Sequence, residues 1–291
     1  MVDILVLNYN DAETTLEYVN QVKNFKCVRK ILIVDNCSTD DSLKVLLECK
    51  FEKVEIISSS ENCGYGAGNN FGIKYLMDYY DSKYILISNP DVIVTDSTIK
   101  KLEDFLKKHQ DFAVVAPFML NPKGEKQINT AFHIPDIKDY IMSFGMIWTK
   151  YFSKYFYKDI LESNREVKVV DGVSGSMLMV NANIMIEKGM YDENIFLYCE
   201  EIVLGIKLKN VGLKTALLTR ETFIHNHSIS ISKTYKSELE RHKLLVKSKL
   251  YVIKKYYNAS PIMYLGAYVM SRVSLIETWL WTLLRPFLKL I

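Results

Sequence analysis

The stretches ILVLNYND (residues 4–11) and ILIVDNCSTD (residues 31–40) decide the fold of this chain. Each begins as a continuous apolar run and changes at once to polar residues. Such runs are typical of strands that helices cover on both faces of a mostly parallel sheet. The two stretches therefore predict neighbouring strands of an α/β sheet, with their polar ends at the same edge.

The alternation of strand and helix continues to about residue 120. Apolar runs predict the strands, and periodic apolar positions predict the helices between them. The predicted strands cover residues 4–7, 31–34, 54–58, 84–88 and 113–116, and the predicted helices cover residues 12–25, 41–49, 67–80 and 97–109. This order predicts a doubly wound α/β sheet.

Residues 121–165 interrupt this order. They are rich in Tyr, Phe, Ile and Lys without a clean period, which indicates an insertion or a mobile segment. Order then returns, with strands predicted at residues 167–170, 176–180 and 215–218 and helices at residues 182–188 and 200–211.

The composition excludes several classes of protein. With 49% hydrophobic residues among 291, the chain can bury one large α/β core or two modest ones, and disorder is not expected. Its five cysteines show no CxxC spacing, so neither a zinc site nor a disulfide framework is expected. No basic leader precedes the first apolar run, and a reducing cytoplasm fits these features. The net charge of +3 predicts no nucleic-acid partner.

The C-terminal region, residues 233–291, is strongly basic. It holds eleven Lys or Arg against three Glu, a balance of +8, whereas residues 1–232 sum to −5. A basic tail on an acidic body predicts contact with an anionic surface. A capping box at residues 237–240 begins a helix expected to end near residue 257. A second helix is predicted from about residue 262 to Arg285, with Pro286 ending it.

The second of these helices is predicted to be amphipathic. At about 100° per residue its polar residues fall on one stripe, and most of the remaining surface is apolar, including Trp279 and Trp281. The stripe consists of Ser271, Ser274, Thr278, Thr282, Arg285 and Lys289. A membrane-spanning helix needs ~20 apolar residues, so we expect a helix in the plane of a membrane surface, at the inner face of the cell membrane. The alternative is a helix packed on the body or on a second subunit, as in a homodimer.

Polar clusters follow three of the predicted strands, at residues 8–11, 35–40 and 89–91. One such cluster is usually a turn with a helix cap, but three at the carboxyl edge of one sheet predict a ligand site. Asp35 at a strand end suits the imide of a pyrimidine or a ribose hydroxyl. Asp91, in a turn stiffened by proline, suits a hard divalent cation that bridges two phosphates.

The segment NCGYGAGNN, residues 62–70, is rich in glycine and opens a helix, so its backbone can approach a ligand closely. It is not a dinucleotide fingerprint, because Asn69 stands where the third glycine would be, and it lacks the lysine of a P-loop. A nicotinamide-dependent enzyme is therefore disfavoured.

Together these stretches resemble the family 2 inverting glycosyltransferases, in particular the bacterial rhamnosyltransferase-like branch that builds surface polysaccharides. The matching stretches are residues 6–10, 34–40, 61–70, 88–92, 173–176, 191–193, 196–198 and 200–201. The resemblance implies a glycosyltransferase A-type fold. It makes residues 1–232 a catalytic domain, with a nucleotide-binding half at about 1–120 and an acceptor half at 121–232, followed by a helical tail at 233–291.

The resemblance also implies roles for single residues. Asp35 would contact the nucleobase, and Asp91 would bind Mg²⁺ or Mn²⁺ through the donor diphosphate. His225 matches a family histidine near the metal, and His227 competes with it; a solvent-facing histidine pair without a role is the alternative. The remaining nucleotide-binding candidates are Asn8, Asn10, Asn36, Asn62, Gly64, Asn69 and Asn89, and the acceptor or sugar pocket would include Gly175, Ser176 and Glu200.

The catalytic base departs from the family pattern, which is Glu-Asp, a second Asp two residues later, and then an Arg. Glu201 stands at the position of the catalytic Asp, Val203 at the second Asp and Lys207 at the Arg. The extra methylene of Glu moves the carboxylate by about 1 Å, a displacement that matters for catalysis. Either the acceptor pocket has shifted to match, or activity is impaired.

These features predict an inverting transfer of a sugar, with rhamnose one candidate, from a nucleotide diphosphate to a saccharide acceptor. The acceptor is expected to be lipid-linked and the product to belong to a capsule or cell wall. The alternative is a weak or inactive homologue that acts as a binding partner in a polysaccharide-assembly complex.

Overall fold

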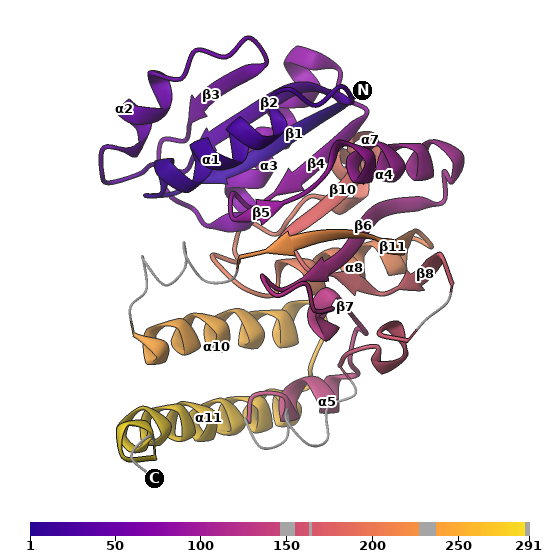
Figure 1. Cartoon of the computed structure of the whole chain (residues 1–291). Helices are drawn as coiled ribbons and strands as arrows, with labels where there is room; N and C mark the ends of the chain where they lie inside the picture. Colours follow the sequence, from indigo (N-terminus) through magenta and orange to yellow (C-terminus); the bar gives the residue numbers. More distant parts are fainter. Residues whose placement is uncertain (146–154, 163–164, 227–236, 289–291) are drawn as a thin grey trace.

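The computed structural model describes residues 1–145, 155–162, 165–226 and 237–288. A nine-stranded sheet forms the centre of the molecule, and a pair of C-terminal helices lies beside it (Figure 1). Along the sheet the strands follow the order β3 (Val54–Ser58), β2 (Val28–Asp35), β1 (Val2–Asn8), β4 (Tyr84–Ser88), β10 (Met177–Asn181), β6 (Phe112–Leu120), β11 (Lys214–His225) and β5 (Val92–Ile93), with β8 (Val167–Val170) also paired to β11.

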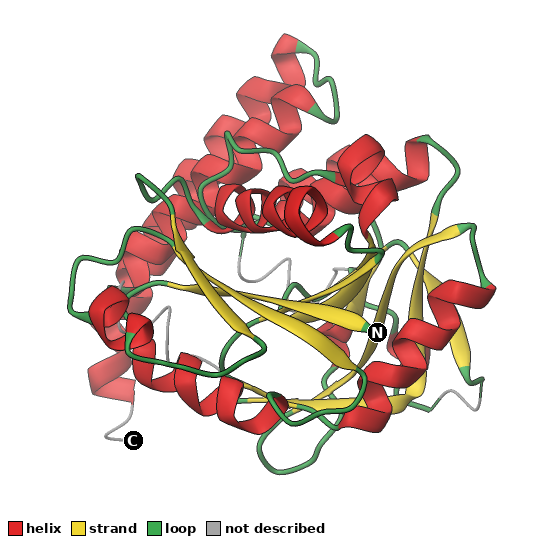
Figure 2. Ribbon diagram, turned by 90° about the horizontal axis from the view of Figure 1, so that it is seen from above, coloured by secondary structure: helices red, strands yellow, loops and turns green. Residues whose placement is uncertain are grey.

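The N-terminal half of the sheet confirms the expected parallel arrangement. β1 pairs in parallel with both β2 and β4, and β2 pairs in parallel with β3. The helices follow the strands as α1 (Ala12–Val22), α2 (Ser42–Leu47), α3 (Tyr65–Tyr80) and α4 (Asp96–Lys108). Viewed from above, helices lie on both sides of the strands (Figure 2). The predicted strands of this half are confirmed, and its helices differ from prediction by a few residues at their ends.

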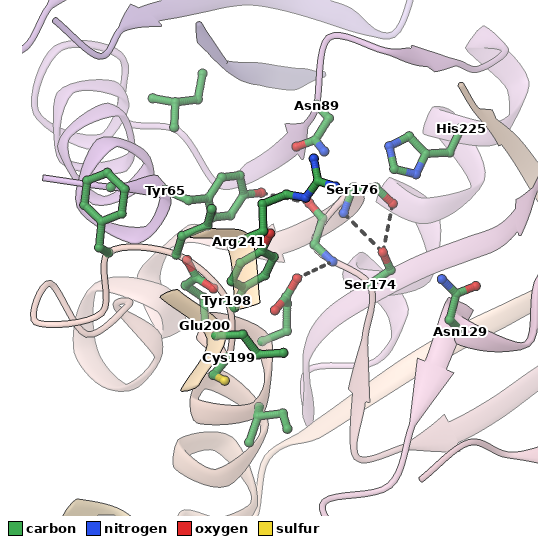
Figure 3. Close-up of a pocket in the computed structure, with 18 of the residues that line it drawn as sticks. Tyr65, Asn89, Asn129, Ser174, Ser176, Tyr198, Cys199, Glu200, His225 and Arg241 are labelled. Carbon is green, nitrogen blue, oxygen red and sulfur yellow. Dashed lines mark hydrogen bonds between the residues drawn. The ribbon is translucent and has the colours of Figure 1, made fainter. Parts of the chain in front are cut away.

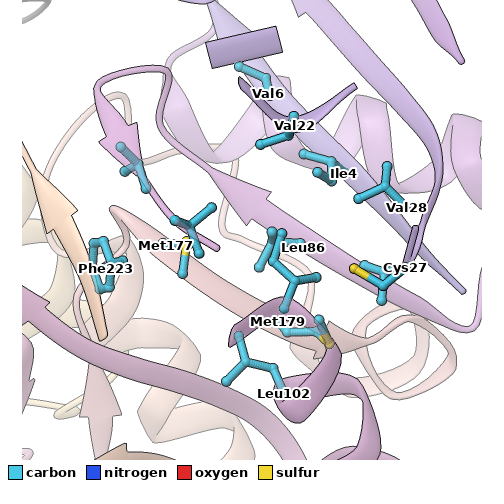
Figure 4. Close-up of a cluster of buried hydrophobic side chains, with 14 of the residues drawn as sticks. Ile4, Val6, Val22, Cys27, Val28, Leu86, Leu102, Met177, Met179 and Phe223 are labelled. Carbon is cyan, nitrogen blue, oxygen red and sulfur yellow. The ribbon is translucent and has the colours of Figure 1, made fainter. Parts of the chain in front are cut away.

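Both faces of the sheet are buried, which explains the continuous apolar runs. Ile4 and Val6 point into one core together with Leu86, Met177 and Phe223 (Figure 4). Alternate residues of the same strands, such as Leu5, Leu32 and Val34, pack in a second core on the opposite face. Since successive side chains of a strand alternate between faces, a strand buried on both sides has no polar positions.

The second half of the sheet is mixed, which the sequence did not predict. β10 lies between β4 and β6 and runs antiparallel to both. β11 is longer than the predicted residues 215–218, because its pairing with β6 resumes at Thr222 after an irregularity. The added length carries His225 to the end of the strand, opposite Val92 of β5.

The described residues between 121 and 162 form short elements, which is why no period is visible in their sequence. They include the 3₁₀ turn η1 (Ile128–Thr130), β7 (Ala131–Phe132), α5 (Ile137–Met142) and the 3₁₀ turn η2 (Lys158–Ile160). β7 pairs with β9 (Gly172–Val173) in a small second sheet. The predicted helix at residues 182–188 is divided into α7 (Ala182–Ile184) and the π-helical turn η3 (Met185–Gly189), and α8 (Glu200–Asn210) follows. Part of the segment predicted to be mobile lies outside the described residues.

The C-terminal helices are α10 (Glu238–Lys255) and α11 (Pro261–Leu288). The predicted cap is confirmed, since Ser237 Oγ accepts a hydrogen bond from the Glu240 amide at 3.4 Å. The predicted end of the second helix is wrong: α11 continues through Pro286 to Leu288. A proline in the last turn removes one backbone hydrogen bond, and the helix tolerates this loss near its end.

α11 packs against α10 with its polar stripe facing inward. Ser271 and Ser274 are fully buried and Thr278 nearly so, and Ser274 Oγ lies 3.0 Å from His242 Nε2 of α10. Thr282 and Arg285 belong to the exposed or partly exposed end of the stripe, and Lys289 lies outside the described residues. Ala267 of α11 is buried in a core shared with α10, whereas many other apolar side chains of α11, such as Ile276 and Trp279, are exposed. None of the helices within the described ranges is long and apolar enough to cross a membrane.

Candidate active site

A pocket of about 880 Å³ opens at the carboxyl ends of β1 and β4, where the sequence predicted a ligand site. Its walls come from both halves of the catalytic region and from α10 (Figure 3). Of the predicted site residues, those that line it are Asn36, Asn62, Gly64, Asn89, Asp91, Gly175, Ser176, Glu200, Glu201 and His225. Asn8, Asn10, Asp35 and Asn69 are not among the lining residues.

Asp35 lies behind the pocket wall and organises it. Its side chain is fully buried and accepts hydrogen bonds from Asn8 Nδ2 at 2.8 Å and from Ser38 Oγ at 2.6 Å. The Asn10 amide donates to the same Ser38 hydroxyl at 2.9 Å. This network ties the ends of β1 and β2 together. A direct contact between Asp35 and a nucleobase stays a prediction.

The neighbouring residue Asn36 does reach the pocket. Its Nδ2 donates to Asn62 Oδ1 at 2.9 Å and to the Gly64 carbonyl at 3.3 Å. Behind these residues, Asn69 is buried and its Nδ2 donates to the Tyr65 carbonyl at 2.9 Å. Asn36, Asn62 and Gly64 thus form a hydrogen-bonded group that lines the pocket, and Asn89 lines the pocket from the end of β4.

Gly64 allows the start of α3 to touch the loop that contains Phe196. Its φ of +97° is unfavourable for other residues, and a Cβ there would lie 2.0 Å from the Phe196 carbonyl oxygen. The next residue, Tyr65, donates its amide to the same carbonyl and its hydroxyl to the Gly175 carbonyl at 2.8 Å. The glycine-rich segment therefore serves close packing as well as approach to a ligand.

Asp91 and His225 meet at one end of the pocket. Asp91 Oδ1 lies 3.2 Å from His225 Nε2, and both side chains are less than 10% exposed, at 7% and 9%. The pairing of β5 with β11 brings them together, and the Asn226 amide donates to the Asp91 carbonyl at 2.9 Å. Asp91 Oδ1 accepts no hydrogen bond from the described part of the chain.

This pair fits a divalent cation. A buried carboxylate oxygen beside an imidazole nitrogen offers two ligands, and Mg²⁺ or Mn²⁺ takes its others from phosphates and water. Within the described ranges no group of three or more His, Cys, Asp or Glu side chains forms a complete metal site. The competing candidate, His227, lies outside the described residues.

Glu200 and Glu201 open α8 across the pocket from Asp91. Tyr198 and Cys199 precede them with φ of 70° and 72°, a left-handed backbone that is uncommon for such residues and is often found at functional sites. Glu201 is partly exposed and its Oε1 accepts the Gly175 amide at 3.0 Å. Glu200 is buried, and its Oε1 has no hydrogen-bond partner among the described residues.

Glu200 and Glu201 differ in how strongly their surroundings favour the ionised carboxylate. Burial and the neighbouring Glu201 hold the pKa of Glu200 well above its usual range. Burial also raises the pKa of Glu201, but backbone amides, including that of Gly175, act in the opposite direction. Because those amides stabilise the anion, Glu201 is the group of the pair that ionises more readily.

Gly175 offers a test of this arrangement. A Cβ at residue 175 would lie 2.4 Å from Glu201 Oε1, so Gly175→Ala must displace the carboxylate. We expect sugar transfer to fall by roughly 10²-fold, the effect of an ångström-scale misplacement, with unchanged donor affinity. Initial rates and calorimetry measure the two effects. Gly266→Ala, where a Cβ meets nothing within 4 Å, is the matched control. Parent-like transfer by Gly175→Ala would show that the Glu201–Gly175 contact is dispensable.

Several pocket residues were not predicted. Tyr140, Tyr155 and Phe156 come from the segment without a period, and Arg241 and Lys249 come from the basic tail. No local sequence motif identifies these residues. The sequence alone does show, however, that Arg241 and Lys249 are separated by about two turns of one predicted helix. The two remaining departures from the family pattern lie outside the pocket lining: Val203 is buried in a core, and Lys207 Nζ donates to the Met190 carbonyl.

Comparison with known proteins agrees with this geometry. The model of "Glycosyl transferase family 2" matches residues 3–181. The hexosyltransferase Agl10 of low-salt glycan biosynthesis in Haloferax volcanii is 23% identical over 78% of this chain and 67% of its own length. The rhamnosyltransferase WbbL of Escherichia coli is 26% identical over 74% and 79%. The N-acetylglucosaminyl-diphospho-decaprenol L-rhamnosyltransferase of Mycobacterium tuberculosis is 23% identical over 73% and 71%.

Solved structures show the same fold at low identity. GalNAc-T7 with UDP, GalNAc and Mn²⁺ aligns with a TM-score of 0.63 at 12% identity, over 87% of this chain and 47% of that chain, so this chain spans about half its length. The mannosyltransferase PcManGT from Pyrobaculum calidifontis, in complex with GDP-Man and Mn²⁺, aligns with a TM-score of 0.57 at 11% identity, over 95% and 73%. With its glycosyltransferase A-type fold and its match over more than half of its length, the chain belongs to glycosyl transferase family 2 and is a glycosyltransferase.

Proposed function

We propose that the chain transfers a sugar from a nucleotide diphosphate donor to a saccharide acceptor with inversion, in the synthesis of a cell-surface polysaccharide. The observation that carries this proposal is a single pocket with Asp91 and His225 at one end, Glu201 across from them, and Gly175 and Ser176 between. Relatives named as rhamnosyltransferases make rhamnose the first sugar to test.

The donor would bind along the ends of β1, β2 and β4. Asn36, Asn62 and Asn89 offer amide groups to the nucleotide, and the buried Asp35 network holds the first two in place. Asp91 and His225 would hold Mg²⁺ or Mn²⁺ against the diphosphate. When bound, the ion offsets the negative charge of the departing nucleoside diphosphate.

Glu201 would act as the base and Glu200 would keep its proton. The acceptor oxygen forms a bond to the anomeric carbon while the bond from that carbon to the phosphate oxygen breaks, and the hydroxyl proton passes to Glu201. One displacement inverts the configuration. The N-terminus of α8 and the Gly175 amide favour the ionised form that this role requires.

The acceptor is proposed to be lipid-linked, because α11 presents an apolar face to the outside. Its exposed side chains are Ile262, Leu265, Tyr268, Val269, Val273, Ile276, Trp279, Leu280, Trp281, Leu283 and Leu284. A contiguous apolar face of this size marks a membrane or protein contact. The +8 charge balance of the tail and its two tryptophans favour a lipid bilayer with anionic headgroups.

Vesicle binding tests this membrane contact. Ile276→Glu combined with Trp279→Glu places charges on the apolar face, so co-sedimentation with anionic vesicles should be lost while nucleotide binding persists. Removal of residues 260–291 should have the same effect, and added salt should weaken binding of the intact chain. Val169→Glu, at a comparably exposed apolar position on β8, is the control. A parent chain that stays in the supernatant as a stable dimer would assign the face to a second copy.

The donor is identified by thermal-shift screening of UDP-, dTDP- and GDP-sugars with Mn²⁺. We expect one nucleotide to stabilise the chain and its sugar to be transferred to a lipid-linked saccharide. Stabilisation by a donor without hydrolysis or transfer, over a range of acceptors, would contradict this function and favour a homologue that acts as a binding partner.

A further inference from the structure

Lys249 of α10 is a buried cation in the pocket wall that the proposed mechanism does not use. Its side chain is 7% exposed, and its ammonium group donates to the Ser143 carbonyl at 2.8 Å and to Ser143 Oγ at 2.7 Å. The rings of Tyr140 and Phe144 lie 5.2 and 4.8 Å from the ammonium nitrogen. No carboxylate of the described chain forms an ion pair with it, and burial lowers the pKa of Lys249 to about 8.

Burying a charge without a counter-ion costs folding free energy, and proteins rarely keep such a group unless a ligand supplies the opposite charge. The carbonyl and hydroxyl oxygens of Ser143 accept hydrogen bonds from the ammonium group of Lys249, but neither carries a negative charge that would offset its positive charge. Because Lys249 lines the pocket, an anion entering the pocket can supply the missing charge.

The position of Lys249 separates it from the metal end of the pocket. Asp91 lies beside His225, and Figure 3 shows Ser176 between His225 and Glu200. On the other side, Cys199 precedes the two glutamates, and its Sγ accepts the Tyr140 hydroxyl at 3.2 Å. Tyr140 in turn carries the ring beside Lys249. These contacts place Lys249 on the side of the two glutamates that carries Cys199.

The face of α10 that lines the pocket carries cationic and apolar side chains. Arg241, Leu245 and Lys249 are spaced four residues apart on α10, so they share one face over roughly 12 Å of helix, and all three line the pocket. Figure 3 shows Arg241 among the pocket side chains near Tyr65 and Ser176. The adjoining wall is aromatic, formed by Phe132, Tyr140, Tyr155 and Phe156.

We propose that Lys249 binds a phosphate of the acceptor, and that the aromatic wall beside it receives the first units of the acceptor's lipid. The acceptor is then a saccharide joined to an isoprenoid-type lipid through phosphate or diphosphate. This inference rests on the proposed function, and it names the acceptor class. The same proposal gives α10 of the C-terminal region a role in binding the acceptor within the pocket, in addition to any contact of α11 with a membrane.

Binding of an isoprenoid diphosphate tests the proposal without requiring transfer. The full chain is saturated with Mn²⁺ and the nucleoside diphosphate selected in the donor screen, so that the donor site is filled. Farnesyl diphosphate and farnesol are then titrated by calorimetry. We expect farnesyl diphosphate to bind at least tenfold more tightly than farnesol, and Lys249→Met to lose about 10- to 100-fold of the diphosphate affinity, as for a lost charge-assisted hydrogen bond. Farnesol affinity should be unchanged.

The matched control is Lys247→Met, which removes an exposed lysine two residues away on the same helix. It should bind both probes like the parent. Equal affinity of Lys249→Met and the parent for farnesyl diphosphate, or equal affinity of the parent for both probes, would overturn the proposal. If binding depends on Lys249 but no donor supports transfer, the proposed function fails and the anion site stands.

Stability separates a ligand site from a structural lysine. Since the buried charge opposes folding of the ligand-free chain, Lys249→Met should keep or raise the melting temperature, and farnesyl diphosphate should stabilise the parent more than the variant. A lowered melting temperature, with Lys249→Gln equally destabilised and binding the diphosphate like the parent, would show that Lys249 acts through its contacts to Ser143 and would overturn the proposal.

Discussion

Replacing Glu201 by glutamine is expected to reduce sugar transfer by ~10²–10⁴, the usual effect of losing a general base, while the donor binds as before. Gln can still accept the Gly175 amide that Glu201 Oε1 accepts at 3.0 Å, so the geometry of the loop is kept and the basicity is lost. Initial rates at saturating donor and acceptor, with calorimetry of the donor, measure the two effects.

Glu200→Gln is the matched control. Burial and Glu201 hold the pKa of Glu200 well above its usual range, which favours the neutral carboxyl group that glutamine resembles. We expect near-parent transfer from Glu200→Gln. Glu201→Asp should be slow, since the shorter side chain moves the carboxylate away from the Gly175 amide. Parent-like transfer by Glu201→Gln together with a large loss in Glu200→Gln would move the role of base to Glu200.

The pH dependence has a definite sign. Burial raises the pKa of Glu201, so the ionised base becomes populated at a higher pH than for an ordinary glutamate. Transfer by the parent should therefore rise with pH through that raised pKa, and this limb of the profile should disappear in Glu201→Gln.

Replacing Asp91 by alanine is expected to abolish the increase in donor affinity that Mn²⁺ produces. Removal of the carboxylate leaves His225 Nε2, which lies 3.2 Å from Asp91 Oδ1, as the remaining ligand of the proposed pair. The fold should persist, because the Asp91 backbone carbonyl still accepts the Asn226 amide and β5 still pairs with β11. Calorimetry of the nucleotide sugar with and without Mn²⁺ measures the change.

Asp40→Ala controls for loss of a carboxylate near the same edge of the sheet. Asp40 is exposed and accepts the Ser42 amide at 2.9 Å, outside the pocket lining. It should retain the full Mn²⁺ effect. Unchanged donor affinity of Asp91→Ala in the presence of Mn²⁺ would contradict the metal assignment.

The sequence by itself determined the parallel N-terminal half of the sheet and the edge at which the pocket opens. The strands at residues 54–58 and 84–88 were predicted with their observed bounds. β3 is a partly exposed strand at the edge of the sheet, whereas β4 is an apolar run because it is buried on both faces. Asn89 and Asp91 follow such a strand directly, so their place at the sheet edge follows from the chain alone.

Tertiary structure decided which side chains reach the pocket. Asp35 and Asn36 are adjacent in sequence, yet Asp35 is fully buried by Asn8 and Ser38, and Asn36 lines the pocket. His225 reaches Asp91 because the irregular pairing of β11 with β6 extends the strand. Such positions depend on pairing between distant segments, which local periodicity does not encode.

The C-terminal helices show the same division. Helical spacing determined that Ser271, Ser274 and Thr278 share one face, and that Arg241 and Lys249 nearly do. Contact between helices decided what those faces meet: the polar stripe of α11 is buried on α10, its apolar face is exposed, and the two cations of α10 line the pocket. A repeat along one helix specifies which residues are neighbours, whereas the partner of that face is chosen by the burial and charge balance of the whole chain.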